Sequence, residues 1–458
     1  MDFDVAIIGG GSAGYAAASS AQSLGAKVAI IDPGPLGGLC ILKGCMPTKA
    51  ILRSSDIMAL MRRAKEFGIQ PVDAQAHLSA INDRKNKLIK EFADYRIEQL
   101  NSPRFTLIEE RAQFISPHEI QIGNKLLKAR SFIIATGSVI ANYSVPGLKE
   151  TGFVTSDDIL KMREAPDSII VLGAGAVAVE LAQFLLRIGV KVTLLQRSEH
   201  ILSKGDEDLA KPVESRFREE GMDLYTGTKI LRAEKKPEGS VIYFEHEGKE
   251  KKVCARYILQ ALGRRPNTDN LQLESAKIET QKSCIPVDSK MKTNQPHIYA
   301  VGDVNGIHEV VHIAIQQGEI AGYNAINPEN ERELDSRLKA SVVFTDPGVA
   351  SVGLSEKECQ ANNIAYLTAS YSFDDHGKSM CLGEKHGHVK LLCNPVSGEV
   401  IGGHIVGPEA GELIHEIITL MHFRGTVKDM LAIPHYHPTL AEILTYPAEE
   451  LFDKLLSS

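Results

Sequence analysis

Two cysteines, Cys40 and Cys45, are separated by four residues in a stretch that is rich in glycine. On an ideal helix, Cα atoms five residues apart lie roughly 8–9 Å from one another, whereas a disulfide requires about 4.4–6.8 Å. The pair can therefore bridge only across irregular backbone, which Gly37, Gly38 and Gly44 permit. A bridge across a distorted turn is more easily reduced than a relaxed structural one. The spacing therefore predicts reversible two-electron redox chemistry.

The same two cysteines could instead be buried structural thiols or half of a zinc site. Zinc-binding cysteines usually occur as two closely spaced pairs, but the other five cysteines are scattered singly. They are Cys254, Cys284, Cys359, Cys381 and Cys393. The zinc interpretation is therefore weak, and the redox interpretation depends on the rest of the sequence.

The composition is that of an ordinary globular enzyme in a reducing compartment. The 458 residues correspond to about three domains, and 43% of them are hydrophobic and 24% charged. A net charge of −7 argues against general nucleic-acid binding, and no apolar run approaches the ~20 residues of a membrane span. The chain opens directly into an apolar segment without a signal-like flank. We therefore expect a cytoplasmic protein, where an accessible dithiol is more often catalytic than structural.

A glycine-rich loop near the N-terminus has the context of a dinucleotide site. It follows an apolar strand at 5–8 and opens an alanine-rich helix at 15–24, and a second strand at 27–31 ends on Asp32. The loop residues are Gly9, Gly10, Gly11, Ser12, Ala13 and Gly14. The glycines would let a pyrophosphate approach backbone amides, and Asp32 would accept hydrogen bonds from ribose hydroxyls. Strand, helix and acid together make this a specific signal.

The same pattern recurs in the middle of the chain. A strand at 168–172 precedes a second glycine loop, which is followed by a helix at 179–187 and a strand at 191–195. The loop residues are Gly173, Ala174, Gly175, Ala176, Val177 and Ala178. Two such units predict two dinucleotide cofactors that exchange electrons.

The two units differ at the position that faces the ribose. Where the first has Asp32, the second has Gln196, which is followed by Arg197. Loss of the acid removes repulsion toward a 2′-phosphate, and Arg197 could pair with one. This favours NADP, but Gln196 could also bind an unphosphorylated ribose, so NAD and NADP both stay open.

Other segments complete an α/β pattern. An amphipathic helix is predicted at 51–65, and a charged one at 80–101 is expected to be a solvated scaffold rather than a site. Strands at 132–134, 256–262 and 298–301 each end in a turn of small residues. From about residue 340, strands mix with helices at 411–423 and 426–430, which suggests an α+β domain.

His437 and Glu442 form the last candidate pair. Histidine exchanges protons near neutral pH, and a carboxylate on its far ring nitrogen would fix the tautomer and raise the basicity. In isolation, a surface or core histidine would be the simpler interpretation. The nearby His404, His415 and His422 do not have a recognised metal-ligand spacing.

From end to end, the chain resembles the FAD-dependent pyridine nucleotide–disulfide oxidoreductases, most closely the dihydrolipoamide dehydrogenase type. The resemblance rests on the two glycine loops, on the cysteine stretch and on several further motifs. These motifs occupy residues 37–49, 135–137, 263–267, 299–303, 344–354 and 437–442. It implies two Rossmann-like dinucleotide-binding domains and an α+β C-terminal dimerisation domain. The expected segments are 1–145 and 267–338 for the two parts of the FAD-binding and central region, 146–266 for NAD(P) and 339–458 for dimerisation.

The resemblance also implies a set of cofactor contacts. Asp32 is expected at the adenosine ribose of FAD and Asp303 at its ribityl–phosphate region, while Lys49 would pair with Glu180 near the flavin. The full set of expected contacts with FAD and NAD or NADP is Gly9, Gly11, Ser12, Ala13, Gly14, Asp32, Lys49, Ala135, Thr136, Gly137, Gly173, Gly175, Val177, Glu180, Gln196, Arg197, Gly263, Gly302 and Asp303.

The implied chemistry is dithiol–disulfide exchange. Cys45 would face the flavin and Cys40 would exchange with a substrate dithiol, most of all a dihydrolipoyl group, either free or on a carrier protein. His437, oriented by Glu442, would reach the cysteines of the other subunit of a homodimer. Electrons could flow from the dithiol to the nicotinamide or in the reverse direction, and the redox poise of the compartment decides which.

Several positions depart from the family pattern. Leu42 stands where the family commonly has Asn, and Ala178 replaces the third glycine of the second loop. Ser19 and Ser20 stand where glutathione reductases usually carry arginines. No cysteine follows Glu442 in this sequence, which disfavours mercuric reductases and large thioredoxin reductases. The alternative function is an NADPH-dependent reductase of another low-molecular-weight disulfide.

Overall fold

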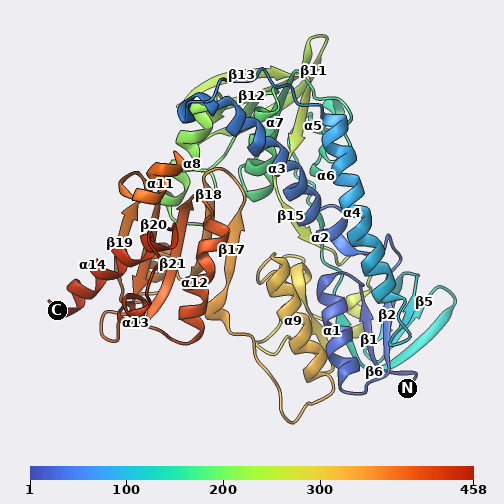
Figure 1. The fold of residues 1–458 in the computed structure, drawn as a ribbon. Coiled ribbons are helices and arrows are strands. Elements are labelled where there is room, and N and C mark those ends of the chain that lie inside the picture. Colours follow the sequence, from blue (N-terminus) through green and yellow to red (C-terminus); the bar gives the residue numbers. More distant parts are fainter. Residues whose placement is uncertain (458) are drawn as a thin grey trace. The chain divides into compact units, whose positions relative to one another are not determined.

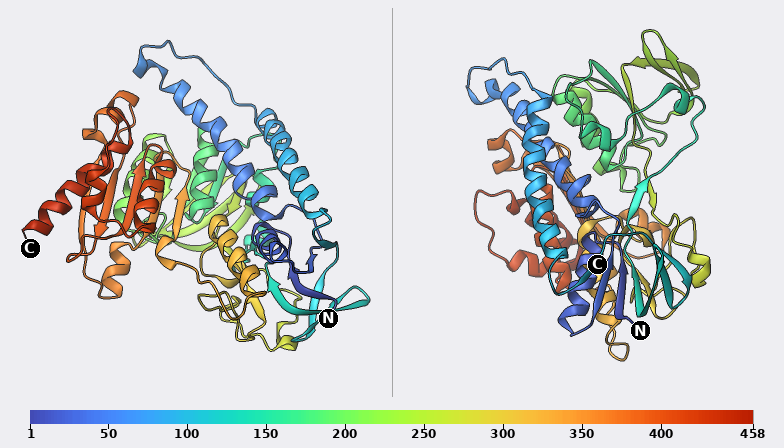
Figure 2. Two further views of the ribbon diagram at one scale, coloured as in Figure 1. Left: turned by 60° about the horizontal axis from the view of Figure 1, so that its bottom comes forward. Right: turned by 90° about the vertical axis from the view of Figure 1, so that its right-hand side faces the viewer.

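Each glycine loop follows a central strand of its own parallel sheet, as the repeated pattern predicts. The computed structural model describes residues 1–457, and the two sheets belong to different units of the chain (Figures 1 and 2). The first unit contains residues 1–50, 83–142 and 263–335, and the second contains residues 51–82, 143–262 and 336–458. The four-segment division expected from the sequence stays a prediction.

The first unit is built on a mainly parallel sheet. β1 (Phe3–Ile8) lies between β2 (Val28–Ile31) and β6 (Lys125–Ile134), in parallel with both. Residues 5–8 and 28–31 are all apolar and buried, as expected for parallel strands that are covered on both faces. The strand order is β3-β2-β1-β6-β5-β4, with β16 also beside β6. The remaining strands are β3 (Thr106–Ile108), β4 (Ala112–Ser116), β5 (Glu119–Ile122) and β16 (Ile298–Ala300).

Helices α1 (Ser12–Ser23) and α9 (Val311–Asn324) lie side by side in this unit (Figure 1). The cysteine region contributes α2 (Gly38–Leu42) and α3 (Cys45–Arg62), and the charged helix is α4 (Leu78–Leu100). The start predicted for the amphipathic helix, residue 51, was therefore wrong by six positions. Pro47 lies in the first turn of α3, where a missing N–H costs nothing, so it does not delay the helix.

The turn predicted at 263–267 is also partly a strand. β15 (Arg264–Pro266) pairs antiparallel with β7 (Ser138–Ile140), the short strand after β6. This ribbon joins two segments of the first unit that are more than a hundred residues apart in the sequence.

The second unit contains the second parallel sheet, in the order β10-β9-β8-β14. Its strands and helices agree closely with the predicted repeat, and an antiparallel three-stranded sheet, β11-β12-β13, lies between β10 and β14 in the chain. The elements are α5 (Leu148–Thr151), α6 (Ser156–Ile159), β8 (Ser168–Leu172), α7 (Ala176–Arg187), β9 (Lys191–Leu195), α8 (Glu207–Glu219), β10 (Asp223–Tyr225), β11 (Lys229–Lys236), β12 (Gly239–His246), β13 (Lys249–Ala255) and β14 (Tyr257–Gln260).

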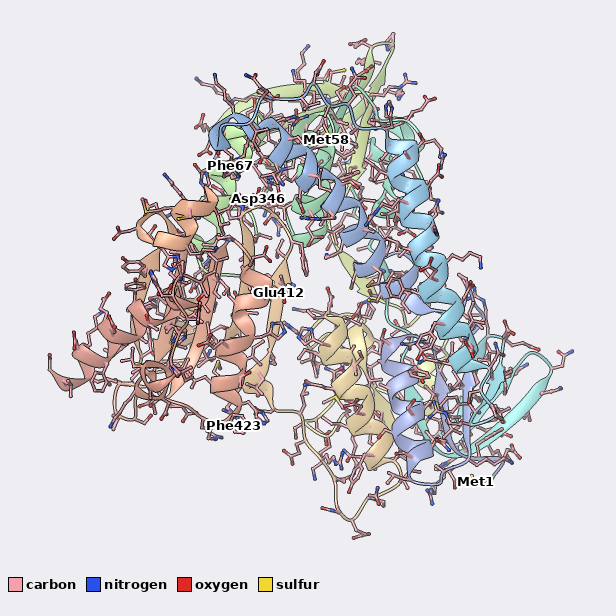
Figure 3. The ribbon with its side chains drawn as sticks, in the orientation of Figure 1. Met1, Met58, Phe67, Asp346, Glu412 and Phe423 are labelled. Atoms are coloured by element: carbon pink, nitrogen blue, oxygen red, sulfur yellow. The ribbon has the colours of Figure 1, made fainter. Side chains whose placement is uncertain are left out.

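The C-terminal part of this unit is the expected α+β arrangement. Five antiparallel strands run in the order β17-β18-β21-β20-β19; α12 packs on β18 and β21, and α14 packs on β19 and β20. Glu412 and Phe423, labelled in Figure 3, mark the two ends of α12. The elements are β17 (Ala340–Val343), β18 (Gly348–Gly353), α10 (Glu356–Ala361), β19 (Leu367–Ser372), α11 (Gly377–Leu382), β20 (His388–Cys393), β21 (Val400–Gly407), α12 (Ala410–His422), α13 (Val427–Ala432) and α14 (Thr445–Leu456).

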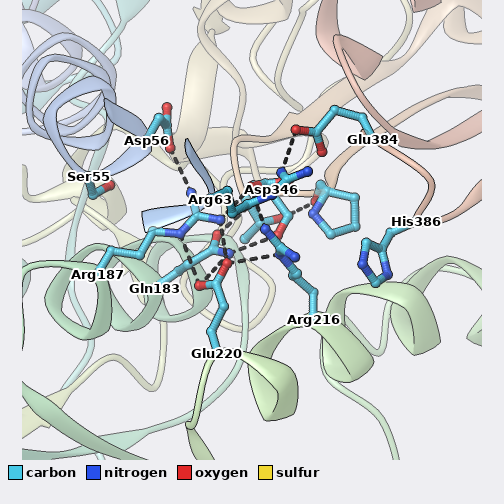
Figure 4. A network of polar contacts seen from close by, with 12 residues as sticks. Ser55, Asp56, Arg63, Gln183, Arg187, Arg216, Glu220, Asp346, Glu384 and His386 are labelled. Atoms are coloured by element: carbon cyan, nitrogen blue, oxygen red, sulfur yellow. Dashed lines mark hydrogen bonds and ion pairs between the residues drawn. The ribbon is translucent and has the colours of Figure 1, made fainter. Parts of the chain in front are cut away.

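A buried arginine connects three parts of the second unit (Figure 4). Arg187, at the end of α7, is 2% exposed and forms ion pairs with Asp56 of α3, Glu220 and Asp346. Asp346 lies in the loop between β17 and β18. The second parallel sheet and the C-terminal sheet are therefore held together by a charge network as well as by apolar contact.

Within the described chain, none of the helices combines the length and the apolar character needed to cross a lipid bilayer.

Candidate active site

The two cysteines lie on either side of a break between two helices. Cys40 is in α2, and Cys45 is the first residue of α3. Between them, Lys43 leaves the helical conformation with φ of −144°, and a Cβ on Gly44 would lie 3.1 Å from the Cα of Cys40. The irregular backbone that the spacing requires is therefore present. The helix break also places the Cys45 side chain at the amino end of α3, where the aligned amides favour a thiolate.

Both cysteines are thiols in this structure, and they interact directly. A hydrogen bond with the Cys45 side chain, burial and the charge of Cys45 together raise the pKa of the Cys40 thiol, and the charge of Lys49 acts in the opposite direction. The Cys40 thiol is therefore held in its protonated form beside Cys45.

The cysteine stretch packs directly on the first glycine loop. Gly38 has φ of +76°, and a Cβ there would lie only 2.7 Å from the Cα of Gly11. Any side chain at this position would therefore separate the two segments. As a result, the thiol pair is held beside the loop that is expected to bind the FAD pyrophosphate.

The first glycine loop leaves its helix amides available to a phosphate. Gly11 caps α1 without a side-chain hydrogen bond, and the first turn contains no acid. Asp32 accepts hydrogen bonds from the amides of Gly10, at 2.7 Å, and Gly34, at 2.8 Å. These bonds fix the loop against the end of β2. The amides of Ser12, Ala13 and Gly14 in the first turn are thus suited to hold the FAD pyrophosphate.

The loop is fixed from its other side by residues 135–137. Gly9 has φ of +111°, and a Cβ there would lie 2.8 Å from the carbonyl carbon of Ala135. Thr136 Oγ1 donates to the carbonyl of Asn267 at 2.7 Å. Gly137 has φ of +68°, and a Cβ there would meet no other atom within 4 Å, so its surface is open to a bound group.

Asp303 belongs to a polar chain that the sequence did not reveal. Ser138 Oγ donates to Asp303 at 2.6 Å, and Arg264 Nε donates to the same hydroxyl at 2.8 Å. The amide of Gly302 donates to Gln317 at 2.7 Å. The sequence indicates Arg264 only as part of a turn motif, because its pairing through β7 and β15 depends on two distant segments.

The second glycine loop has the same local geometry. Gly173 has φ of +95°, and a Cβ there would lie 2.6 Å from the carbonyl oxygen of Ala261. Gly175 caps α7 without a side-chain hydrogen bond, and the first turn has no acid. Val177, in that turn, is 43% exposed. Gly263, with φ of +128°, follows the neighbouring strand β14. These features suit the second dinucleotide.

The residues proposed to select the nucleotide lie at the end of β9. The backbone of Gln196 is anchored by the carbonyl of Tyr225 at 2.9 Å, and its side chain reaches the carbonyl of His200 at 3.5 Å. Arg197 is exposed. Glu180, in α7, is 4% exposed and accepts a hydrogen bond from the amide of Phe344 at 2.9 Å.

His437 and Glu442 form the pair that the sequence suggested. Nδ1 of His437 lies 2.8 Å from Glu442 Oε1, and the amide of Thr439 donates to Glu442 Oε2 at 2.9 Å. The hydrogen bond with His437, followed by that from Thr439, lowers the pKa of Glu442. The His437 side chain is 81% exposed, so its free ring nitrogen is available to a reacting group.

The structure thus groups the predicted residues into three places. Cys40, Cys45 and Lys49 lie with the first glycine loop in the first unit, and the second loop and the His437–Glu442 pair lie in the second. Among residues 1–457, no cluster of His, Cys, Asp and Glu side chains is suited to a metal ion.

Comparison with known proteins identifies the family. Residues 3–318 match the family described as pyridine nucleotide-disulphide oxidoreductase, and residues 339–448 match its dimerisation domain. A mercuric reductase of Staphylococcus aureus is 33% identical over 458 residues, which cover 100% of this chain and 83% of that protein. A dihydrolipoyl dehydrogenase of Bacillus subtilis is 31% identical over 462 residues, which cover 97% of this chain and 96% of that protein.

Solved structures show the same fold. LpdA from Mycobacterium tuberculosis superposes with a TM-score of 0.88 at 27% identity, covering 98% of this chain and 99% of that one. The HOCl-induced flavoprotein disulfide reductase RclA from Escherichia coli gives a TM-score of 0.85 at 23% identity, covering 97% of this chain and 99% of that one. The chain therefore belongs to the pyridine nucleotide–disulphide oxidoreductase family, whose members bind FAD and NAD(P).

Proposed function

We propose that this protein catalyses dithiol–disulfide exchange at Cys40 and Cys45, with a dihydrolipoyl group or another small dithiol as substrate and NAD(P) as the second partner. The observation that carries the proposal is the packing of the hydrogen-bonded thiol pair on the first glycine loop, through Gly38 and Gly11. A structural cysteine pair would have no need to lie against a phosphate-binding loop.

The exchange steps follow from the roles of the two sulfurs. One substrate thiolate attacks Sγ of Cys40 in the oxidised pair, and Cys45 leaves as a thiolate. The second substrate sulfur then attacks the sulfur that is bound to Cys40, so that Cys40 is released and the substrate becomes a disulfide. Two electrons have then moved from the substrate to the pair.

His437 is proposed to handle the protons of these steps. Its Nδ1 is occupied by Glu442, so Nε2 is the atom that would take the proton from a substrate thiol. In the proposed homodimer, the imidazole acts on the cysteines of the partner subunit. The match of residues 339–448 to the family's dimerisation domain supports this arrangement.

Residues around the first glycine loop are proposed to bind FAD. We propose that Ser12, Ala13 and Gly14 hold the FAD pyrophosphate, that Asp32 holds its ribose, and that Asp303 holds its ribityl–phosphate region. When it is bound, FAD supplies a two-electron relay between the thiol pair and the nicotinamide.

The nucleotide is proposed to lie on the second glycine loop. Gly175 and Val177 would approach its pyrophosphate, and Gln196 and Arg197 would contact the ribose end. Lys49 is proposed to pair with Glu180 near the flavin. The exposed Arg197 favours NADP over NAD. The alternative function, an NADPH-dependent reductase of a small disulfide, would require that preference.

Steady-state assays test the proposal. The purified protein should be yellow, should reduce NAD or NADP with dihydrolipoamide, and should oxidise NADH or NADPH with lipoamide. Both Cys40→Ser and Cys45→Ser should abolish these activities but retain reduction of ferricyanide by NAD(P)H, which needs no thiol. The matched control Cys254→Ser alters an exposed cysteine and should have no effect.

The outcomes separate the candidates. Activity with a small disulfide and NADPH, without activity on lipoamide, would establish the alternative. Full lipoamide activity in Cys40→Ser would exclude the thiol pair as the reacting centre.

A further inference from the structure

An arginine of the charged helix α4 packs on α1 at Tyr15, one turn after Gly11, and the cysteine stretch packs on Gly11 through Gly38. The guanidinium carbon of Arg96 is 4.2 Å from the centre of the Tyr15 ring, and the Cys40 thiol is among the groups that act electrostatically on it. Tyr15 belongs to α1 and Cys40 to α2. Arg96 therefore contacts α1 close to the place where the cysteine stretch packs on the first glycine loop.

Arg96 has no anionic partner in the part of the chain that the structure describes. Its Nε and Nη1 atoms are buried and have no hydrogen-bond partner among residues 1–457. Burial lowers the pKa of Arg96, but a guanidinium remains charged at neutral pH. A charge that is largely removed from water without a counter-charge is unfavourable. Arg96 is therefore suited to an anion that comes from outside the chain.

Neighbouring polar atoms also have unused hydrogen-bonding capacity. Gln99 Oε1 and Ser19 Oγ are buried without a partner among the described residues. Gln99 lies one turn after Arg96 on α4, and Ser19 lies one turn after Tyr15 on α1, so each shares a helix face with its neighbour. These two atoms without hydrogen-bond partners therefore lie on the helices that Tyr15 and Arg96 join.

Tyr15 also contacts a second arginine, at the edge of its ring. Its ring packs edge-on against Phe105, with centroids 6.1 Å apart, and its hydroxyl oxygen accepts a hydrogen bond from Arg104 at 3.2 Å. Arg104 is exposed and lies over Phe105 at 4.9 Å. Arg104 is therefore a solvent-exposed arginine that contacts the same tyrosine as Arg96.

We infer that Arg96 is an anion-recognition residue of the exchange site, which selects substrates that carry a carboxylate near the sulfur pair that reacts with Cys40. The inference rests on the proposed function, because it requires Cys40 to be the exchanging thiol. The substrate class is thus a small carboxylate-bearing disulfide or dithiol, in preference to its neutral amide.

Lipoate and lipoamide form a matched pair of probes, because they differ only in a carboxylate and an amide. In Arg96→Gln, we expect the ratio of kcat/KM for lipoate to that for lipoamide to fall about tenfold, mainly through KM for lipoate. Arg96→Lys should recover part of the ratio. The control Arg104→Gln should leave it unchanged.

A second measurement follows the thiol itself. Cys45 and Lys49 act electrostatically on Cys40, and Cys40 acts in turn on Arg96. In the reduced protein, loss of the guanidinium should move the pH midpoint of Cys40 alkylation by iodoacetamide upward by about one unit. Arg104→Gln should not move it.

These results distinguish the inference from the function on which it rests. Wild-type protein that uses neither lipoate, lipoamide nor any other small disulfide would contradict the proposed function, and an unchanged alkylation midpoint in Arg96→Gln would then overturn the inference as well. Normal wild-type turnover with an unchanged lipoate preference in Arg96→Gln would overturn the inference alone. Loss of bound FAD in Arg96→Gln, measured from the flavin absorbance, would show instead that the arginine holds the cofactor, and would also overturn it.

Discussion

Glu442 uses its two carboxylate oxygens for two different donors, His437 and the amide of Thr439. An amide cannot serve both, because its NH2 group would face one of the donors. The hydrogen bonds lower the pKa of Glu442 below its usual value of 4.5, so the carboxylate stays ionised throughout the neutral range. Its contribution is to keep His437 in one tautomer.

Glu442→Gln should therefore lower kcat with dihydrolipoamide by about 10²-fold while bound FAD is unaffected. The matched control is Glu416→Gln, which alters the partner of a second histidine, His435, at 2.7 Å. That variant should retain kcat within about twofold. Equal losses in both variants would mean that the effect is structural rather than specific to His437.

Arg197 should decide how well the enzyme accepts a 2′-phosphate. In Arg197→Ala, KM for NADP or NADPH should rise about tenfold, since one charge-assisted hydrogen bond is lost, and KM for NAD or NADH should not change. Arg256→Ala is the control and should change neither KM, because Arg256 precedes β14 at the opposite end of the same sheet. Unaltered KM values for both nucleotides in Arg197→Ala would refute the role of this residue.

At this scale, the sequence revealed residues that belong to motifs and missed those that act through distant contacts. Cys40, Cys45 and Asp32 stand in recognisable local patterns. Arg96 does not, because its environment depends on α1 and α2 as much as on α4. The prediction that its helix is a solvated scaffold used the many charges of the segment and could not identify Arg96, whose Nε and Nη1 atoms are buried.

Among the elements, the two parallel sheets were predictable because each strand is a buried apolar run between a turn and a helix. The strands β8 and β9 have the predicted limits. The antiparallel elements β11 to β13 were not predicted. Their sequences mix charged and apolar residues, as in Lys229–Lys236. The pairing of these strands depends on the register between them rather than on a local pattern.

A second charge network links elements of the second unit, and it makes the free energy of unfolding depend on pH. Lys390 of β20 is 3% exposed and contacts Asp206 at 2.8 Å and Asp208 at 2.8 Å. Burial raises the pKa values of both carboxyls, but their hydrogen bonds outweigh it, so both lie below the usual 3.8. Depressed carboxyl pKa values stabilise the fold above pH 3.8, and this stabilisation is lost as the pH falls through the folded-state values.

Lys390→Met should lower the free energy of unfolding by about 2–4 kcal/mol at pH 7, a value reduced from that of a fully buried pair because Asp208 is partly exposed. The difference from wild type should shrink as the pH falls below about 3.8, because the carboxyls are then neutral in both proteins. Denaturant unfolding at several pH values measures this. Lys236→Met, which removes an exposed pair with Glu234, should show neither effect; a pH-independent difference for Lys390→Met would contradict the electrostatic explanation.

At the scale of the whole molecule, the proposed active site requires two chains. The His437 side chain is 81% exposed, and residues 339–448 belong to a dimerisation domain. Exposed apolar and aromatic side chains in that region, including Phe423 at 76% and Tyr436 at 82%, suit a surface that a second subunit covers.

Heterodimers of two inactive variants test whether the imidazole acts across the dimer. A heterodimer of Cys40→Ser and His437→Gln subunits, isolated with two different affinity tags, has one site with intact cysteines and an intact partner histidine. It should therefore show about half of the wild-type activity, although each homodimer is inactive. If His437 served the cysteines of its own chain, both sites of the heterodimer would be defective and no activity would return. The control heterodimer of Cys40→Ser and Cys45→Ser must stay inactive under either arrangement, because each of its two sites lacks one sulfur, so activity there would reveal contaminating wild-type subunits rather than a shared site.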